Sequence, residues 1–177
     1  MNWVTRHRMR RAPEPPSSGC GISGATGIFW VEVPRDQRPK ALIYVDTSPS
    51  MEDWAERTVY IIDRLKDDLP TRMYAFAGSV QECDTADFAK GNYYAGWSTY
   101  FDAVITHALE HEGELVIVIT DGQSSVSAEN KELFRKSGKR LFTILCGSRG
   151  DSRYNGLDLR EIAEETMCLL TNPKRGR

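Results

Sequence analysis

The chain has 177 residues, of which 40% are hydrophobic and 27% are charged, and its formal net charge at pH 7 is −2. This length and composition are typical of one globular domain with a real hydrophobic core. The small net charge argues against a general electrostatic attraction to nucleic acids or membranes, and no run of about 18 apolar residues is present to span a bilayer.

The first 27 residues are predicted to form a flexible segment outside the fold. They contain a basic cluster from Arg6 to Arg11, which leads into the Pro- and Ser-rich stretch RAPEPPSSG. No apolar stretch of the secretory type is present among them. A solvated tail is the favoured interpretation of the basic cluster, and contact with nucleic-acid phosphate is the alternative. Residues 172–177 are also basic and are expected to be frayed.

A single α/β domain is predicted over residues 28–171, because extended and helical patterns alternate along it. In chain order, strands are expected at 28–34, 41–46, 71–78, 79–88, 114–122, 139–147 and 168–171, and helices at 50–69, 98–112, 127–138 and 157–167. This alternation predicts a doubly wound, mostly parallel central sheet flanked by helices on both faces, in a Rossmann-like arrangement.

The helix expected at residues 50–69 has a polar start and one apolar stripe. Ser50, with Asp53 three residues later, has the pattern of a capping box. The stripe consists of Trp54, Thr58, Ile61, Ile62, Leu65 and Leu69. A second helix is expected to begin after Ser127 and to end at Gly138.

The two most apolar strands both run into an aspartate, Asp46 in YVD and Asp121 in ITD. Ligands of doubly wound sheets bind at the carboxyl ends of the strands, where the strand order reverses. If these two strands are central neighbours, their carboxylates face each other across that crevice. Ser48 and Ser50 follow Asp46 at alternate positions, so one loop can aim three oxygens at one point. Carboxylates and hydroxyls are hard oxygen ligands that suit Mg²⁺.

Three separated motifs together resemble the von Willebrand factor type A domain. They are VDTSPSM, GWST followed by YFDAVITHAL, and VIVITDG, and the resemblance covers about residues 40–170. It implies a metal-ion-dependent adhesion site (MIDAS) that holds Mg²⁺ or Mn²⁺ and leaves one position for an acidic side chain of a partner. Carried over to this chain, the metal site consists of Asp46, Ser48, Ser50, Thr99 and Asp121.

Two positions depart from the family's pattern. Pro49 stands where the D-x-S-G-S motif has glycine, so the loop is stiffer and lacks an N–H donor. Trp97 stands in the loop that supplies Thr99, where it either forms part of the ligand surface or covers the edge of the core. The predicted rim for a partner consists of Pro49, Trp97 and Gln123.

The resemblance implies a non-catalytic, metal-dependent binding module rather than an enzyme. Its expected partner is a protein that presents Asp or Glu. Related intracellular domains serve in multi-protein complexes, sometimes with an ATPase or an RNA-binding component. A cytoplasmic location is expected, because the four cysteines contain no C-x-x-C pair and no secretory signal is seen. A scaffold domain with a vestigial metal site is a further alternative.

The enzymatic alternative rests on HALEH, residues 107–111, which matches the H-x-x-E-H pattern of inverted zinc peptidases. In that interpretation His107 and His111 bind Zn²⁺, and Glu110 activates water. A third ligand is then needed. The candidates for it are Glu161, Glu164 and Glu165. Histidine near a helix C-terminus is also favoured by the helix dipole without any metal.

Overall fold

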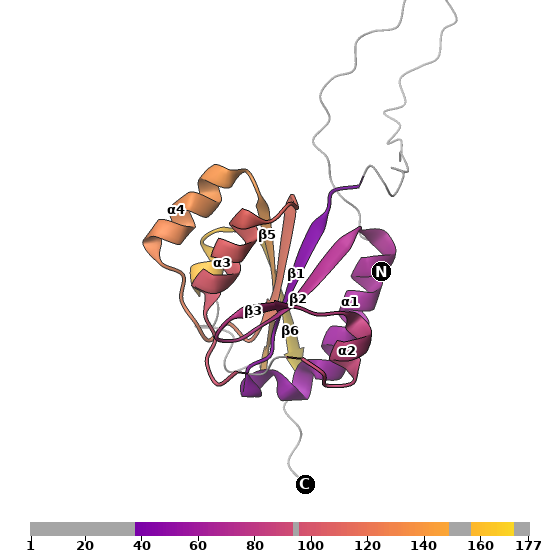
Figure 1. Cartoon of the computed structure of the whole chain (residues 1–177). Helices are drawn as coiled ribbons and strands as arrows, with labels where there is room; N and C mark the ends of the chain where they lie inside the picture. Colours follow the sequence, from indigo (N-terminus) through magenta and orange to yellow (C-terminus); the bar gives the residue numbers. More distant parts are fainter. Residues whose placement is uncertain (1–37, 94–95, 149–156, 172–177) are drawn as a thin grey trace, which may run out of the picture. The chain divides into compact units, whose positions relative to one another are not determined.

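The computed structural model describes residues 38–93, 96–148 and 157–171. Within these ranges one six-stranded sheet has the order β3-β2-β1-β4-β5-β6 (Figure 1). The strands are β1 (Ala41–Asp46), β2 (Thr71–Phe76), β3 (Val80–Glu82), β4 (Leu115–Thr120), β5 (Arg140–Ser148) and β6 (Ala163–Thr171). Neighbouring strands are parallel except for β2 and β3. The predicted α/β class with a mostly parallel sheet is therefore confirmed.

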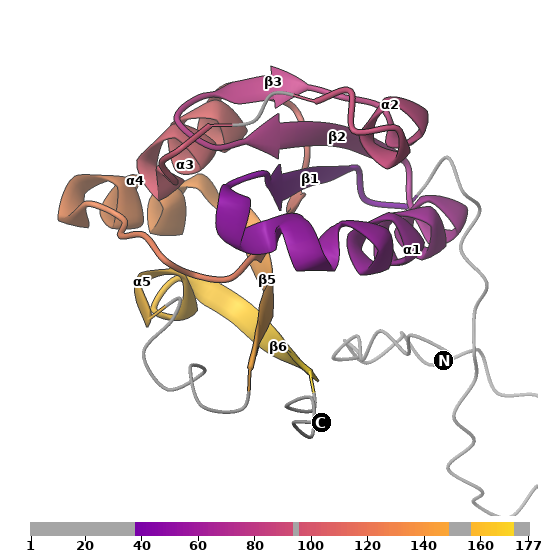
Figure 2. The ribbon, with the colours of Figure 1, turned by 90° about the horizontal axis from the view of Figure 1, so that it is seen from below.

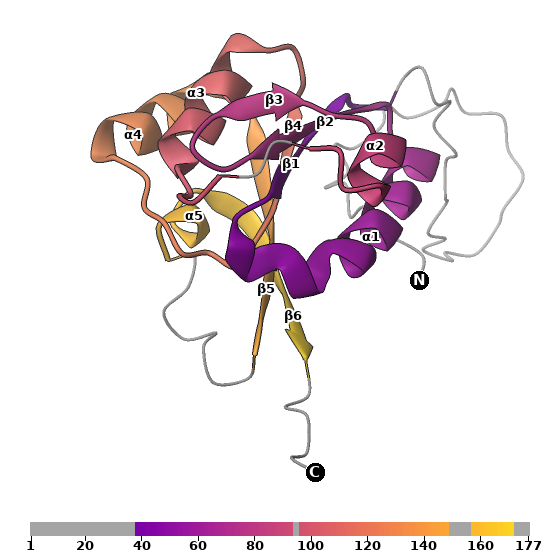
Figure 3. The same ribbon diagram turned by 60° about the horizontal axis from the view of Figure 1, so that its bottom comes forward.

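Helices cover both faces of this sheet. They are the 3-10 helix η2 (Pro49–Trp54) and the α-helices α1 (Ala55–Asp68), α2 (Thr85–Ala89), α3 (Phe101–Glu110), α4 (Ala128–Ser137) and α5 (Leu157–Arg160). Figures 2 and 3 show α1 and α2 on one side of the sheet and α3, α4 and α5 on the other. The predicted doubly wound architecture is thus observed.

Each face has its own core, because successive strand residues point to opposite sides. One core joins alternate β1 residues, Leu42 and Tyr44, to the apolar side of α3, including Phe101 and Ile105. The other core joins Ala41, Ile43 and Val45 to η2, α1 and α2. Every residue of β1 and β4 is buried, as the continuous apolar runs predicted.

The order of the strands fixes where a ligand can bind. From β1 the chain winds outward to β2 and β3, and from β4 it winds the other way to β5 and β6. The winding direction therefore reverses between β1 and β4, which are direct parallel neighbours. The crevice at their carboxyl ends is the switch point at which doubly wound sheets bind ligands.

The start of the helix predicted at residues 50–69 differs in the structure. A 3-10 turn begins at Pro49, with Ser48 as its N-cap, so the predicted capping box of Ser50 and Asp53 is wrong. Proline favours the first helical position, because its fixed φ suits the helix and its missing N–H is not needed there. The predicted apolar stripe is confirmed, with Thr58 and Ile62 buried.

Two further segments differ from the prediction. The strand predicted at 79–88 ends at Glu82, and α2 follows, because the side chain of Asp84 accepts a hydrogen bond from the Asp87 N–H and caps that helix. The helix predicted at 157–167 ends at Arg160, and the chain continues as β6. Pairing with β5 satisfies backbone groups along an edge that would otherwise stay open, and this outweighs local helix propensity.

Several predictions lie outside the described residues. These are the N-terminal segment 1–27, the strand at 28–34 and the tail at 172–177. In the described part of the chain, no helix is both long enough and apolar enough to cross a membrane.

An aromatic cluster ties α3 to the middle of the sheet. The rings of His107 and His111 stack with centroids 3.8 Å apart, and His107 also contacts Tyr74 edge-on at 4.5 Å. The hydroxyl of the buried Tyr44 lies 2.8 Å from His107 Nδ1. Burial lowers the pKa of His107, and so does His111, while Glu110 and Glu82 oppose this shift.

This cluster predicts a loss of stability on mild acidification. In the unfolded chain His107 becomes protonated below about pH 6.5, its ordinary pKa. In the folded chain it stays neutral until the pH approaches its lowered pKa. The free energy of unfolding should therefore fall as pH decreases through this window and level off below it. Urea unfolding of wild type and His107→Gln between pH 7.5 and 5.5 measures the effect.

The matched control is His7→Gln, which removes a histidine from the predicted N-terminal tail. It should keep the wild-type pH profile, whereas His107→Gln should flatten it. An unchanged profile in His107→Gln would show that this imidazole does not couple to folding.

Candidate functional site

The site begins with Asp46, the last residue of β1, which lies next to β4 at the switch point. Its side chain is only 1% exposed. The hydroxyl of Thr120, at the end of β4, donates to Asp46 Oδ2 at 2.6 Å, and the backbone N–H of Ser48 donates to Oδ1 at 2.9 Å. The carboxylate is therefore held by β4 on one side and by the loop that follows β1 on the other.

The loop after β1 brings two hydroxyls together. The Oγ atoms of Ser48 and Ser50 lie 3.1 Å apart, with Ser48 buried and Ser50 exposed. Pro49, between them, occupies the first position of η2, and the Met51 N–H donates to the Ser48 carbonyl. The proline thus fits the turn, and the two oxygens point to a common place beside Asp46.

The second carboxylate, Asp121, directly follows β4 and is 5% exposed. Gln123 holds both of its oxygens: the Gln123 backbone N–H donates to Oδ1 at 3.2 Å and the side-chain amide donates to Oδ2 at 2.7 Å. Gln123 was predicted as part of the partner-binding rim. Its side chain is exposed but donates a hydrogen bond to the carboxylate, so Gln123 helps to fix the orientation of Asp121.

The loop before α3 lies against the loop that follows Asp121. The Ser124 hydroxyl donates to the Thr99 backbone carbonyl at 2.7 Å, and the side chain of Thr99 is half-buried. Trp97 is 95% exposed, so it does not cover the edge of the core. The structure therefore brings the loop of Thr99 to the loop of Asp121 and leaves the indole free on the surface.

The electrostatics of the site favour a cation. Burial raises the pKa of Asp46, hydrogen bonds from Thr120 and Ser48 oppose this, and repulsion from Asp121 raises it further. Burial also raises the pKa of the neighbouring Cys146 thiol to about 12, with contributions from both aspartates. Two buried like charges around one point are stabilised by a positive charge between them.

The donor set fits Mg²⁺ or Mn²⁺. These ions prefer oxygen ligands and keep several waters, so two carboxylates with hydroxyls suffice. Among the residues that the structure describes, no group of three or more His, Cys, Asp or Glu side chains could hold a metal. Clusters of that kind are typical of zinc sites. The site at Asp46 differs from them, because most of its oxygens come from serine and threonine hydroxyls.

The zinc alternative finds little support in the geometry. His107 Nδ1 is engaged by the Tyr44 hydroxyl, and His111 Nδ1 lies 2.8 Å from the His107 carbonyl. The candidate third ligands precede or lie on β6, at the edge of the sheet opposite β3. Glu161 pairs there with Lys131 at 2.8 Å, and Glu164 pairs with Arg140. These contacts do not involve the Nε2 atom of either histidine, so zinc is disfavoured by the lack of a third ligand beside them among the described residues.

Two residues of the site were not predicted to belong to it, although Thr120 lies within the motif VIVITDG. Thr120 belongs to a buried apolar strand, and only the register of β1 against β4 places its hydroxyl at Asp46. Cys146 lies on β5, far along the chain, and is buried. Its place beside both aspartates follows from strand order, which no local pattern encodes.

Comparison with known proteins adds little. No protein-family model matches the sequence, and no curated protein matches it. A solved structure of an aerotolerance-related membrane protein from Bacteroides fragilis NCTC 9343, with multiple mutations to serines, is similar to 60% of this chain and 67% of that chain. The TM-score is 0.48 and the sequence identity is 21%.

The hydrogen bond from Thr120 to Asp46 predicts a large effect of a small change. Thr120→Val keeps the shape of the side chain but removes the donor from a buried carboxylate and the acceptor of the Gly122 N–H. The free energy of unfolding should fall by about 2 kcal/mol, the usual cost of removing a hydrogen bond to a buried charged group. Urea unfolding at pH 7 measures it.

Thr143→Val is the matched control. Thr143 is equally buried on β5, but its hydroxyl has no hydrogen-bond partner among the residues that the structure describes. Its replacement by valine should leave stability unchanged or raise it, because no bond is lost. Equal losses in the two variants would contradict the role assigned to Thr120.

Proposed function

We propose that this protein is a non-catalytic binding module that holds Mg²⁺ or Mn²⁺ at the carboxyl ends of β1 and β4. The observation that carries the proposal is the pair of buried aspartates, Asp46 and Asp121, at the switch point of the sheet. The motifs that contain them resemble those of the von Willebrand factor type A domain, which supports the same function.

In this proposal the hydroxyls of Ser48, Ser50 and Thr99 are direct ligands of the ion. Asp46 and Asp121 act directly or through water. The 3.1 Å separation of the two serine Oγ atoms suits adjacent positions around one small cation. Thr120 and Gln123 hold the two carboxylates, as partners of metal ligands commonly do.

The partner is proposed to be a protein that offers an Asp or Glu side chain. That carboxylate takes the position that the domain leaves to water and completes the octahedron. The rim offers apolar contact as well: Pro49 is exposed, and Trp97 has one of the most exposed large apolar side chains among the described residues. Aromatic side chains of this kind often dominate binding energy at interfaces.

The setting of the module is a broader proposal. Domains of the family that it resembles serve in intracellular multi-protein complexes, some with an ATPase or RNA-binding component. A cytoplasmic role of this type agrees with the motifs, and the search for a partner should begin among proteins with exposed acidic loops. A scaffold domain that binds no cation is the alternative that the following experiment separates.

The proposal predicts which ion the protein retains. After equilibration with Mg²⁺, Mn²⁺ and Zn²⁺ together, wild type should hold one Mg²⁺ or Mn²⁺, measured by elemental analysis. Asp46→Ala should bind the ion at least about tenfold more weakly, because it loses a group that binds or orients ligands. Asp53→Ala, which removes an exposed carboxylate of η2, should behave as wild type.

The other outcomes separate the alternatives. Zinc retained by wild type and lost in His107→Ala would overturn the proposal in favour of a hydrolase. No bound ion in any variant would favour the scaffold.

A second prediction concerns the partner's side chain. A short peptide with a single aspartate should bind in the presence of Mg²⁺ and not after chelation with EDTA, measured by NMR shifts of the Trp97 indole N–H. The same peptide with asparagine is the control, since the amide lacks the charge that the ion attracts. Equal binding of the two peptides would contradict carboxylate coordination.

A further inference from the structure

The segment that follows Asp121 has an unusual support. Residues 122–127 lie between β4 and α4 and have no regular secondary structure. Four of their backbone N–H groups donate to side chains. They are those of Gly122 to Thr120, Gln123 to Asp121, Val126 to Asp158 and Ser127 to Asp102. Side chains, rather than a backbone ladder, therefore determine the path of this loop.

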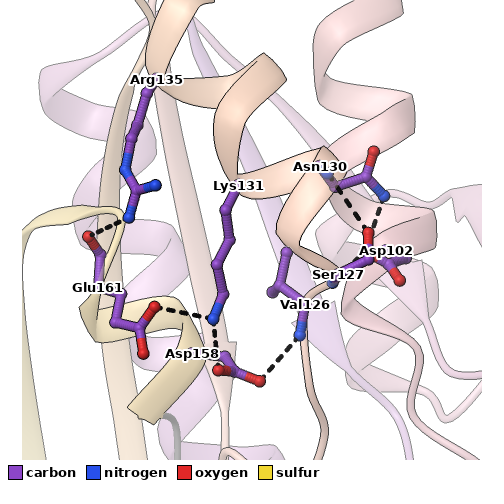
Figure 4. A network of polar contacts seen from close by, with 8 residues as sticks. All are labelled: Asp102, Val126, Ser127, Asn130, Lys131, Arg135, Asp158 and Glu161. Atoms are coloured by element: carbon purple, nitrogen blue, oxygen red, sulfur yellow. Dashed lines mark hydrogen bonds and ion pairs between the residues drawn. The ribbon is translucent and has the colours of Figure 1, made fainter.

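Asp102, in the first turn of α3, binds the far end of the loop. One of its oxygens, Oδ1, accepts hydrogen bonds from the Ser127 backbone N–H at 2.9 Å and from the Ser127 hydroxyl at 3.0 Å. The same oxygen accepts a third from the Asn130 amide at 2.7 Å (Figure 4). Because Thr99 lies just before α3, this carboxylate links the loop of one proposed ligand to the loop of another.

Asp158, on α5, binds the loop from the other side. Its Oδ2 accepts from the Val126 N–H at 3.1 Å, and its Oδ1 pairs with Lys131 Nζ at 2.5 Å (Figure 4). Lys131 also pairs with Glu161 at 2.8 Å, and its side chain is only 13% exposed. The ammonium of Lys131 thus fixes Asp158 in place while Asp158 holds the loop.

Both carboxylates are stabilised in the charged form. The hydrogen bond from Lys131 lowers the pKa of Asp158. For Asp102 burial acts to raise the pKa, but hydrogen bonds from Asn130 and Ser127 outweigh it, and the net shift is downward. At neutral pH both groups are therefore acceptors for the loop.

We propose that Asp102 and Asp158 are positioning residues that clamp residues 122–127 and so hold Asp121 in the orientation needed to bind the cation. This inference rests on the proposed function of the site at Asp46. Neither carboxylate belongs to the predicted metal ligands. Through Asp158 the affinity for the ion depends on how α5, and the edge strand β6 that follows it, pack against α4.

The test compares Asp102→Ala and Asp158→Ala with Glu132→Ala in the full-length chain. Glu132 also forms an ion pair on α4, with Lys136 at 3.1 Å, and both residues of that pair are exposed. The readouts are the Mn²⁺ dissociation constant from electron paramagnetic resonance, urea unfolding without cation, and hydrogen exchange at the amides of Gln123 and Val126.

Both clamp variants should bind Mn²⁺ more weakly by on the order of tenfold, the lower end of what outer partners of metal ligands contribute. Exchange at Gln123 and Val126 should accelerate, while Glu132→Ala should match wild type in both. Asp102→Asn, which keeps an oxygen for Ser127, should recover most of the affinity. It also serves as the milder variant should Asp102→Ala fail to fold.

The outcomes separate the two proposals. Lower stability with unchanged Mn²⁺ affinity and unchanged exchange would show that both aspartates have only a structural role, and this would overturn the inference. If wild type binds no Mn²⁺, the proposed function fails, and the inference fails with it as an account of cation binding. Accelerated exchange in the clamp variants would then show only that the loop is clamped.

Discussion

The site depends on one constraint: two carboxylates of like charge are buried at the carboxyl ends of adjacent parallel strands. Burial disfavours the ionised form of Asp46, and the charge of Asp121 adds to that cost. Hydrogen bonds from Thr120 and Ser48 offset part of that cost at Asp46. The divalent cation proposed for this site would offset more, because it would attract both charges. In the proposed function, the arrangement that disfavours two ionised aspartates is the one that attracts the ion.

The parallel arrangement of β1 and β4 also accounts for the loops around the site. Parallel strands cannot be joined by tight turns, so the chain must leave β1 and β4 through longer connections. Those connections have few backbone partners of their own, and side chains supply the missing acceptors, as at Gly122 and Val126. Their geometry can therefore be tuned by residues outside the site, such as Asp158, without change to the sheet.

Much of this arrangement was predictable from sequence, because it follows from local patterns. The apolar runs of β1 and β4, and the aspartates that end them, predicted both the buried strands and the crevice. Contacts between distant segments were not predictable. The hold of Thr120 on Asp46 requires the register of β1 with β4, and the strand at β6 requires an open edge on β5. In both cases the pairing of strands in the folded protein determines the structure, and local residue preferences do not.

At Pro49 the local structure accommodates a departure from the motif. In an extended loop, proline in place of glycine removes a donor and restricts the path of the chain. Here the residue begins η2, where neither property has a cost. Because the helix starts at the proline, Ser48 stays extended and donates its backbone N–H to Asp46, while Ser50 turns back to within 3.1 Å of the Ser48 hydroxyl. The rigid residue therefore fits the turn that brings the two serine hydroxyls together, and the departure from the motif does not by itself remove the convergence of oxygens that the proposed site requires.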